Sequence, residues 1–171
     1  LHTLVLGASG AVYSFGHGQC GKLGHGDEHT LHAPRRIDAL AAVRAVAVAV
    51  GQQHSLVLSA SGVVYSFGSG FSGKLGHGEQ RNRSMPTPIR GLAHADGEGV
   101  GFGEEMGEMS ETGGGFSERM NGLDERVGGV AVLAAGALHS LAATSSDGAL
   151  YSFGSNSAWQ LGHGELRHDE L

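Results

Sequence analysis

Residues 54–78 read HSLVLSASGVVYSFGSGFSGKLGHG, and residues 2–26 read HTLVLGASGAVYSFGHGQCGKLGHG. Nineteen of these 25 aligned positions are identical, at an offset of 52 residues. A third copy, HSLAATSSDGALYSFGSNSAWQLGHG, occupies residues 139–164 and has one extra residue in its first turn. Self-similarity at a fixed period is the sequence signature of a repeat architecture. The chain therefore consists of repeated units.

Each copy predicts a β-hairpin followed by a glycine-rich loop. A short apolar run, a turn ending in glycine and a second run rich in Val, Tyr and Phe are typical of paired strands. Glycine at the turn, and again after the second strand, fits a backbone with positive φ. The expected strands span residues 3–6, 11–15, 55–58, 63–67, 140–143 and 149–153.

One further strand is expected before each of the last two copies. Val46, Val48 and Val50 alternate with alanine and end at a glycine, and residues 130–134 repeat this pattern. The alanines would also allow a helix, but alternating β-branched residues favour a strand. The segment 34–44 stays ambiguous, with one more short strand expected near Ile37.

Three or four short strands repeated about every 50 residues are typical of a propeller blade. At the level of motifs the chain resembles the RCC1 repeat family, named for the regulator of chromosome condensation. The resemblance rests on the string from His54 to Gly78, on the pattern Pro34-x-x-Ile37-x-x-Leu40 and on the Val-Ala-x-Gly sequence that ends at Gly51. The third copy adds Asn156, Gln160, Leu161 and Gly162, but Trp159 stands where the family pattern has glycine.

The resemblance implies a seven-bladed propeller, of which this chain holds about three repeats. We therefore expect an all-β fold: a partial β-propeller of about three RCC1-like blades over residues 1–171, with copies at about 2–53, 54–138 and 139–171. The chain begins with Leu1 and no leader follows, so we expect a fragment of a longer protein.

One glycine-rich acidic insertion breaks the period. Residues 94–126 hold nine glycines, nine acidic residues and two arginines, so the charge of this segment alone is −7. The rest of the chain is near neutral, because the net charge of the whole is −6. Such a composition predicts a flexible loop. A surface insertion is the simpler interpretation, and a partner-binding arm is the alternative.

Composition excludes several classes of protein. One cysteine excludes an internal disulfide and a cysteine-based zinc site. The net charge of −6 argues against direct nucleic-acid binding by this chain. No apolar run approaches the roughly 20 residues of a membrane helix, so no membrane partner is expected.

Two glycine loops resemble a phosphate-binding P-loop but lack residues that a P-loop needs. Residues 16–22 and 68–74 both end in Gly-Lys, but leucine follows the lysine where Ser or Thr should bind magnesium. The Gly-His-Gly that comes next would break the helix on which phosphates sit. We expect neither ATP nor GTP binding.

The eleven histidines raise the question of a metal site. His25, His29 and His32 lie near Cys20, but His25 recurs as His77 and His163 without companions. His2, His54 and His139 form a second repeated class. We expect these six histidines to be hydrogen-bonded within or between blades. Trp159 is the one tryptophan, so it is expected to be a packed or interface aromatic rather than part of a light-sensing cluster.

These observations predict a non-enzymatic protein-interaction scaffold, because function in propellers lies in loops on their faces. The alternative, implied by the founding member of the family, is guanine-nucleotide exchange on a Ran-type small GTPase. No residue is assigned as catalytic, cofactor-binding or metal-binding, no cofactor or small-molecule substrate is expected, and the partner-binding residues stay open. A cytoplasmic or nuclear location is favoured. If His168-Asp169-Glu170-Leu171 were a true C-terminus, it would instead be a retrieval signal for the endoplasmic-reticulum lumen.

Overall fold

The computed structural model describes residues 1–92, 129–145 and 148–163. The acidic segment 94–126 and the tetrapeptide 168–171 lie outside the described residues. Ten strands and four short 3-10 turns make up the regular structure of the described part. No helix within these ranges is long and apolar enough to cross a membrane.

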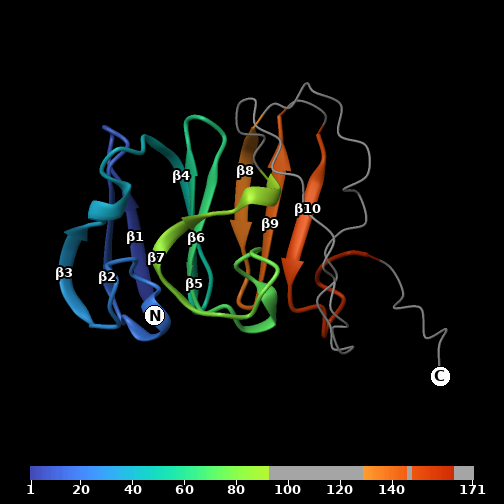
Figure 1. The fold of residues 1–171 in the computed structure, drawn as a ribbon, viewed down its shortest axis with the longest axis horizontal. Helices are drawn as coiled ribbons and strands as arrows, with labels where there is room; N and C mark the ends of the chain where they lie inside the picture. The colour runs from blue at the N-terminus through green and yellow to red at the C-terminus, as the bar shows by residue number, and fades with distance from the viewer. Residues whose placement is uncertain (93–128, 146–147, 164–171) are drawn as a thin grey trace, which may run out of the picture.

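The strands form three antiparallel sheets that lie side by side (Figure 1), which we call blades 1, 2 and 3. Blade 1 contains β1 (His2–Leu6), β2 (Val12–Gly16) and β3 (Leu31–Arg36). Blade 2 contains β4 (Ala45–Val50), β5 (His54–Ser59), β6 (Val64–Gly68) and β7 (Arg83–Pro88). Blade 3 contains β8 (Val130–Ala135), β9 (His139–Thr144) and β10 (Leu150–Gly154). The 3-10 turns are η1 (Gln19–Gly21), η2 (Asp38–Leu40), η3 (Phe71–Gly73) and η4 (Arg90–Leu92).

The structure confirms the all-β partial propeller and its strands. Each of the six hairpin strands begins and ends within one residue of its expected position, and both lead-in strands are present as β4 and β8. The ambiguous segment differs in detail. Its strand, β3, ends at Arg36, and η2 follows directly after Ile37. Pro34 is tolerated in β3 because this strand pairs only with β2, so one edge needs no N–H donor.

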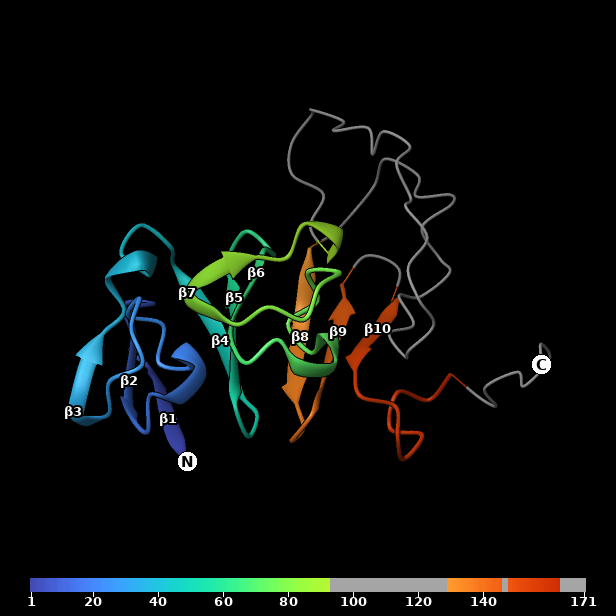
Figure 2. The same cartoon turned by 60° about the horizontal axis from the view of Figure 1, so that its bottom comes forward.

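The direction of the strands places the connections between them at two opposite ends of the sheets. In every blade the hairpin pairs its first histidine with the glycine that ends the next strand: His2 with Gly16, His54 with Gly68 and His139 with Gly154. The long loops that follow, residues 17–30, 69–82 and 155–163, therefore leave the same end of the sheets. We call this end the loop face. The turns that join the two strands of each of these histidine-led hairpins lie at the other end, the turn face (Figure 2).

The core lies between neighbouring blades. One buried cluster joins blades 1 and 2 and a second joins blades 2 and 3. The first contains Val12, Ile37, Leu40, Ala45, Val57 and Phe67, and the second contains Leu58, Val64, Ile89, Val130, Ala142 and Phe153. Because these side chains leave water only when two blades meet, apolar burial stabilises the junctions rather than isolated sheets.

A buried serine holds each loop to its own blade. The Ser66 hydroxyl lies 2.7 Å from the Leu75 carbonyl oxygen and 2.9 Å from His77 Nε2. The hydroxyl has one proton, which it donates to the carbonyl, so His77 must donate to it through Nε2–H. Ser14 and His25, and Ser152 and His163, repeat this arrangement. The loop thus returns to the strand at a fixed point in all three blades.

Substitution of Ser66 by alanine tests this point. We expect the free energy of unfolding to fall by about 1–3 kcal/mol, because the variant leaves a buried carbonyl and an imidazole N–H without their partner. Ser9→Ala is the matched control, since Ser9 is exposed in a turn and its loss should change stability little. Urea denaturation of both variants measures the difference. Equal stability of the two would contradict the assignment.

Candidate functional site

A second set of serines joins each blade to the next. Ser55 Oγ, in β5 of blade 2, donates to the Lys22 carbonyl oxygen of blade 1 at 2.8 Å. The His2 ring of blade 1 lies 2.7 Å away through Nε2 and is the donor to that hydroxyl. This contact connects the start of β1, the loop after η1 and the start of β5. The first loop is therefore anchored to two blades.

The same arrangement recurs at the next junction. The His54 Nε2 atom lies 2.9 Å from Ser140 Oγ in β9, and this hydroxyl donates to the Lys74 carbonyl oxygen at 2.9 Å. The expectation of hydrogen-bonded histidines is thus confirmed for five of the six repeat positions. The exception within the described ranges is His139, whose ring has no hydrogen-bond partner there.

A glycine three residues before the histidine makes room for its ring. A Cβ atom added at Gly51 would lie 2.1 Å from His54 Cε1, and one at Gly136 would lie 2.1 Å from His139 Cε1. The Gly51 amide also donates to the His54 carbonyl oxygen at 2.9 Å. The Val-Ala-x-Gly motif is therefore explained by close packing against the junction histidine.

The two lysines of the apparent P-loops are structural. Lys22 is 3% exposed and Lys74 is 1% exposed, and both backbone carbonyls are bound by junction serines. Burial lowers the pKa of Lys74. No α-helix follows either lysine: η1 and η3 end just before Lys22 and Lys74, and the next elements are the strands β3 and β7. The geometry of these loops lacks what phosphate binding needs, and the absence of nucleotide binding stays a prediction.

The histidines and cysteine considered for a metal do not come together. His25 is bound to Ser14, and the exposed His29 pairs with Asp27, its Nδ1 lying 3.4 Å from Asp27 Oδ2. Cys20 is a free thiol in η1. In the part of the chain that the structure describes, no three His, Cys, Asp or Glu side chains are arranged to hold a metal ion.

The loop face carries two large exposed aromatic side chains. Phe71 in η3 is 62% exposed, and Trp159 in the third loop is 55% exposed. Phe71 is partly held in place, because the Lys74 ammonium lies 5.7 Å from its ring centroid. Trp159 is therefore not packed in a core. Phe71 was missed by the sequence analysis, although it stands at a position where the other copies have Gln19 and Ser157.

Trp159 has a backbone conformation that suits glycine. Its φ is +61°, in the left-handed region, and the aligned residues Gly21 and Gly73 have φ of +75° and +70°. A side chain at such a position costs roughly 1–2 kcal/mol. Strain of this kind is retained mainly at positions that serve function.

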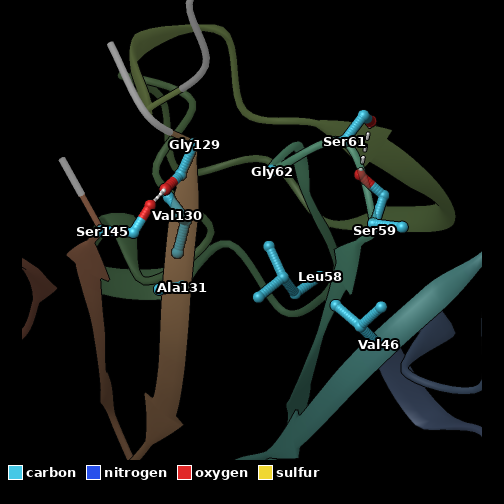
Figure 3. Close-up of a pocket in the computed structure, with 10 residues that line it drawn as sticks. Val46, Leu58, Ser59, Ser61, Gly62, Gly129, Val130, Ala131 and Ser145 are labelled. Atoms are coloured by element: carbon cyan, nitrogen blue, oxygen red, sulfur yellow. Dashed lines mark hydrogen bonds between the residues drawn. The ribbon is translucent and has the colours of Figure 1, made fainter.

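A shallow pocket lies on the turn face, where blade 2 meets blade 3 (Figure 3), with a volume of about 320 Å³. Its lining consists of Val46, Leu58, Ser59, Ala60, Ser61, Gly62, Gly129, Val130, Ala131 and Ser145. Ser59 and Ser61 hydrogen-bond to each other at 2.9 Å, and Ser145 Oγ donates to the Gly129 carbonyl oxygen at 3.2 Å. No acid, base or metal ligand is among the described residues that line it.

Comparison with known families agrees with the geometry. A family model described as "Regulator of chromosome condensation (RCC1) repeat" matches residues 9–58 and 61–100, and a second model of the same description matches residues 45–74. The chain belongs to the RCC1 repeat family. Its three sheets are successive blades of an RCC1 propeller, and the repeated Ser–His contacts hold the blades and their loops in place.

Several larger RCC1-repeat proteins are similar to this chain. The human E3 ubiquitin-protein ligase HERC2 is 33% identical over 98% of this chain and 4% of its own length. The Arabidopsis thaliana ultraviolet-B receptor UVR8 is 32% identical over 99% of this chain and 43% of its own length. This chain thus spans less than half of either relative.

Solved structures show the same fold at lower identity. Prp20p from Saccharomyces cerevisiae matches with a TM-score of 0.66 and 22% identity, over 96% of this chain and 33% of its own. That structure was described together with the binding properties of Prp20p to Gsp1p and histones. Human WBSCR16 matches with a TM-score of 0.61 and 22% identity, over 90% of this chain and 30% of its own. These matches establish the propeller fold.

Alanine substitution at Gly21 and Gly73 separates backbone strain from blade contact. Both glycines have positive φ, but a Cβ at Gly21 would lie 2.4 Å from Ser84 Cα in β7, whereas one at Gly73 meets nothing within 4 Å. Gly73→Ala should cost about 1–2 kcal/mol from strain alone. Gly21→Ala should cost about 1–3 kcal/mol more, because β7 must move. Chemical denaturation measures both, and equal losses would contradict the blade contact.

Substitution of Trp159 by glycine should stabilise the chain by about 1 kcal/mol. Glycine relieves the strain of the left-handed backbone, which stabilises the folded chain. It also adds backbone entropy to the unfolded chain, which offsets part of this gain. Trp159→Ala is the matched control, since it removes the indole and keeps the strained Cβ. A thermal melt that ranks the glycine variant no higher than the alanine variant would show that the strain is absent.

Proposed function

We propose that this chain is a protein-interaction scaffold that binds its partners through the loop face. The observation that carries the proposal is Trp159, a strained and half-exposed tryptophan at a position where both other copies have glycine. Tryptophan is among the residues that contribute most binding energy at protein interfaces. A large exposed aromatic held at a cost in stability is best explained by contact with a partner.

The neighbouring blade explains why this position differs. At the junction of blades 1 and 2, the β7 backbone approaches Gly21 so closely that no Cβ fits between them. A strand that approached residue 159 in the same way would collide with the Trp159 Cβ. A strand therefore cannot approach Trp159 as closely as β7 approaches Gly21.

The loops are rigid enough to present these side chains in one arrangement. The first residue of each loop donates its amide to the carbonyl oxygen of the residue just before the histidine strand: His17 to Leu1, Ser69 to Gln53 and Ser155 to Leu138. The Ser–His contacts fix the other end of each loop. Binding residues on loops that a rigid scaffold positions lose little entropy when a partner docks.

The partners we propose are proteins of the kind that the structural relatives bind. Prp20p is described with Gsp1p and histones, and yeast RCC1 (Prp20) was solved with Kap60 bound. Guanine-nucleotide exchange on a Ran-type GTPase is the narrower alternative. The described residues supply no group that we assign to catalysis. We place such a scaffold in the cytoplasm or nucleus, and the alternative location rests on residues 168–171.

Direct binding to three purified proteins tests the proposal. Gsp1p, core histones and Kap60 are titrated against the immobilised chain and against the double variant Phe71→Ser/Trp159→Gly. We expect at least one of the three to bind, and the double variant to weaken that binding at least about tenfold, as loss of interface aromatics does. Release of labelled GDP from Gsp1p, followed in parallel, distinguishes exchange from simple binding.

Leu150→Ser is the matched control. Leu150 is 69% exposed, but it lies at the turn end of β10, where it pairs with Ala143. This variant should bind like the wild type. Equal binding by the double variant would contradict the placement of the surface on the loop face, and failure of all three proteins to bind would contradict the proposed partner class.

A further inference from the structure

The junction histidine His54 is fully buried between blades 2 and 3, at 0% exposure. Since the Ser140 hydroxyl proton is used on the Lys74 carbonyl, the neutral ring must carry its proton on Nε2. Nδ1 is then the bare nitrogen, and it is buried without a hydrogen-bond partner. Protonation of the ring would place a second N–H there with no acceptor.

Among the residues that the structure describes, no group that faces His54 would compensate a positive charge. The titratable groups that face the ring are Lys74 after η3, His2 of β1 and His139 of β9. All three are cationic when charged. Burial first, and then the Lys74 ammonium, lower the pKa of His54 from 6.5 to about 4.

His2 repeats the situation at the first junction. Its ring donates to Ser55, and it faces the Lys22 ammonium. Burial first, and then this cation, lower the pKa of His2 to about 4 as well. Two successive junctions thus depend on a neutral histidine at the loop face.

At the turn face of each junction, the blades are joined by hydrogen bonds between backbone groups of the described residues. The Ala45 amide donates to the Gly10 carbonyl oxygen at 3.0 Å, and the Val130 amide donates to the Gly62 carbonyl oxygen at 3.3 Å. These backbone contacts do not change between pH 7.5 and pH 5. The two ends of a junction therefore respond differently to acid.

We propose that the blade junctions are acid-sensitive hinges: protonation of His54 and His2 opens them at the loop face, while backbone contacts keep them closed at the turn face. The inference goes beyond the proposed function, because it describes how the spacing of the interaction loops changes. Both histidines have a lower pKa in the folded chain than in the unfolded one. Their neutral forms therefore stabilise the closed junction fully above pH 6.5. This support declines as the pH falls toward 4.

Spin-label distances at the two faces test the hinge at the junction of blades 2 and 3. In a Cys20→Ser background, one pair of labels is placed at Ser72→Cys and Ala158→Cys on the loop face. A second pair is placed at Ala60→Cys and Ala131→Cys on the turn face, where both residues are exposed. Between pH 7.5 and pH 5 we expect the loop-face distance to lengthen and broaden and the turn-face distance to stay constant.

His54→Gln supplies the decisive comparison, because glutamine can donate to Ser140 but does not titrate in this range. In this variant the loop-face distance should be the same at both pH values. The exposed His32→Gln is the control and should keep the wild-type response. An unchanged loop-face distance in the otherwise unmodified chain, a response that persists in His54→Gln, or both distances lengthening together would each overturn the proposal.

An NMR measurement on the unmodified chain keeps the test valid if the glutamine variant does not fold. The imidazole nitrogen shifts of His54 report its tautomer directly. We expect the Nε2–H form at pH 7.5 and loss of the neutral signals only well below pH 6.5. An Nδ1–H tautomer, or a ring that is already cationic at pH 6.5, would overturn the inference.

Discussion

The structure depends on serine hydroxyls that accept a hydrogen bond from histidine and donate one to a backbone carbonyl. A hydroxyl has one proton, so once the carbonyl is its acceptor the histidine must be the donor. Ser66 applies this constraint within a blade and Ser140 applies it between two blades. Each serine thereby fixes a strand, a loop and a histidine relative to one another.

Apolar burial and these polar contacts contribute to the fold in different ways. The two clusters between blades provide the favourable free energy of burial, which is large but not directional. The hydrogen bonds add less net stability, but a buried donor left unpaired is costly, so they select one register of blade against blade. Glycine completes the fit: a Cβ at Gly24 would lie 2.8 Å from the Phe67 ring of the next blade.

Much of this arrangement could be predicted from the sequence, because the repeat carries it. Alternating apolar residues and turn glycines located the six hairpin strands and the two lead-in strands to within a residue, whereas β7 was not predicted. Repetition also marked His2 and His54 as structural. Their partners could not be predicted, since His54 bonds a serine 86 residues away, and periodicity does not show which copies touch. The strand before Ile37 was placed too late because Pro34 and Arg35 are weak strand formers, and pairing with β2 outweighs that propensity.

The candidate interaction surface lies where the copies differ, and this follows from how the repeat uses its residues. Positions shared by all copies hold side chains that are buried in the packing of the fold, as Ser66 and Leu75 are. A position is available for recognition only if the fold tolerates change there. Phe71 stands where the first copy has glutamine, and Trp159 stands where both other copies have glycine. The Trp159 φ of +61° lies in the region that glycine adopts in the other two copies, so the second substitution is costly for the fold. Cys20 and Ser72 also have positive φ in the first two loops, so the third loop differs in the size of the side chain that is held in this conformation.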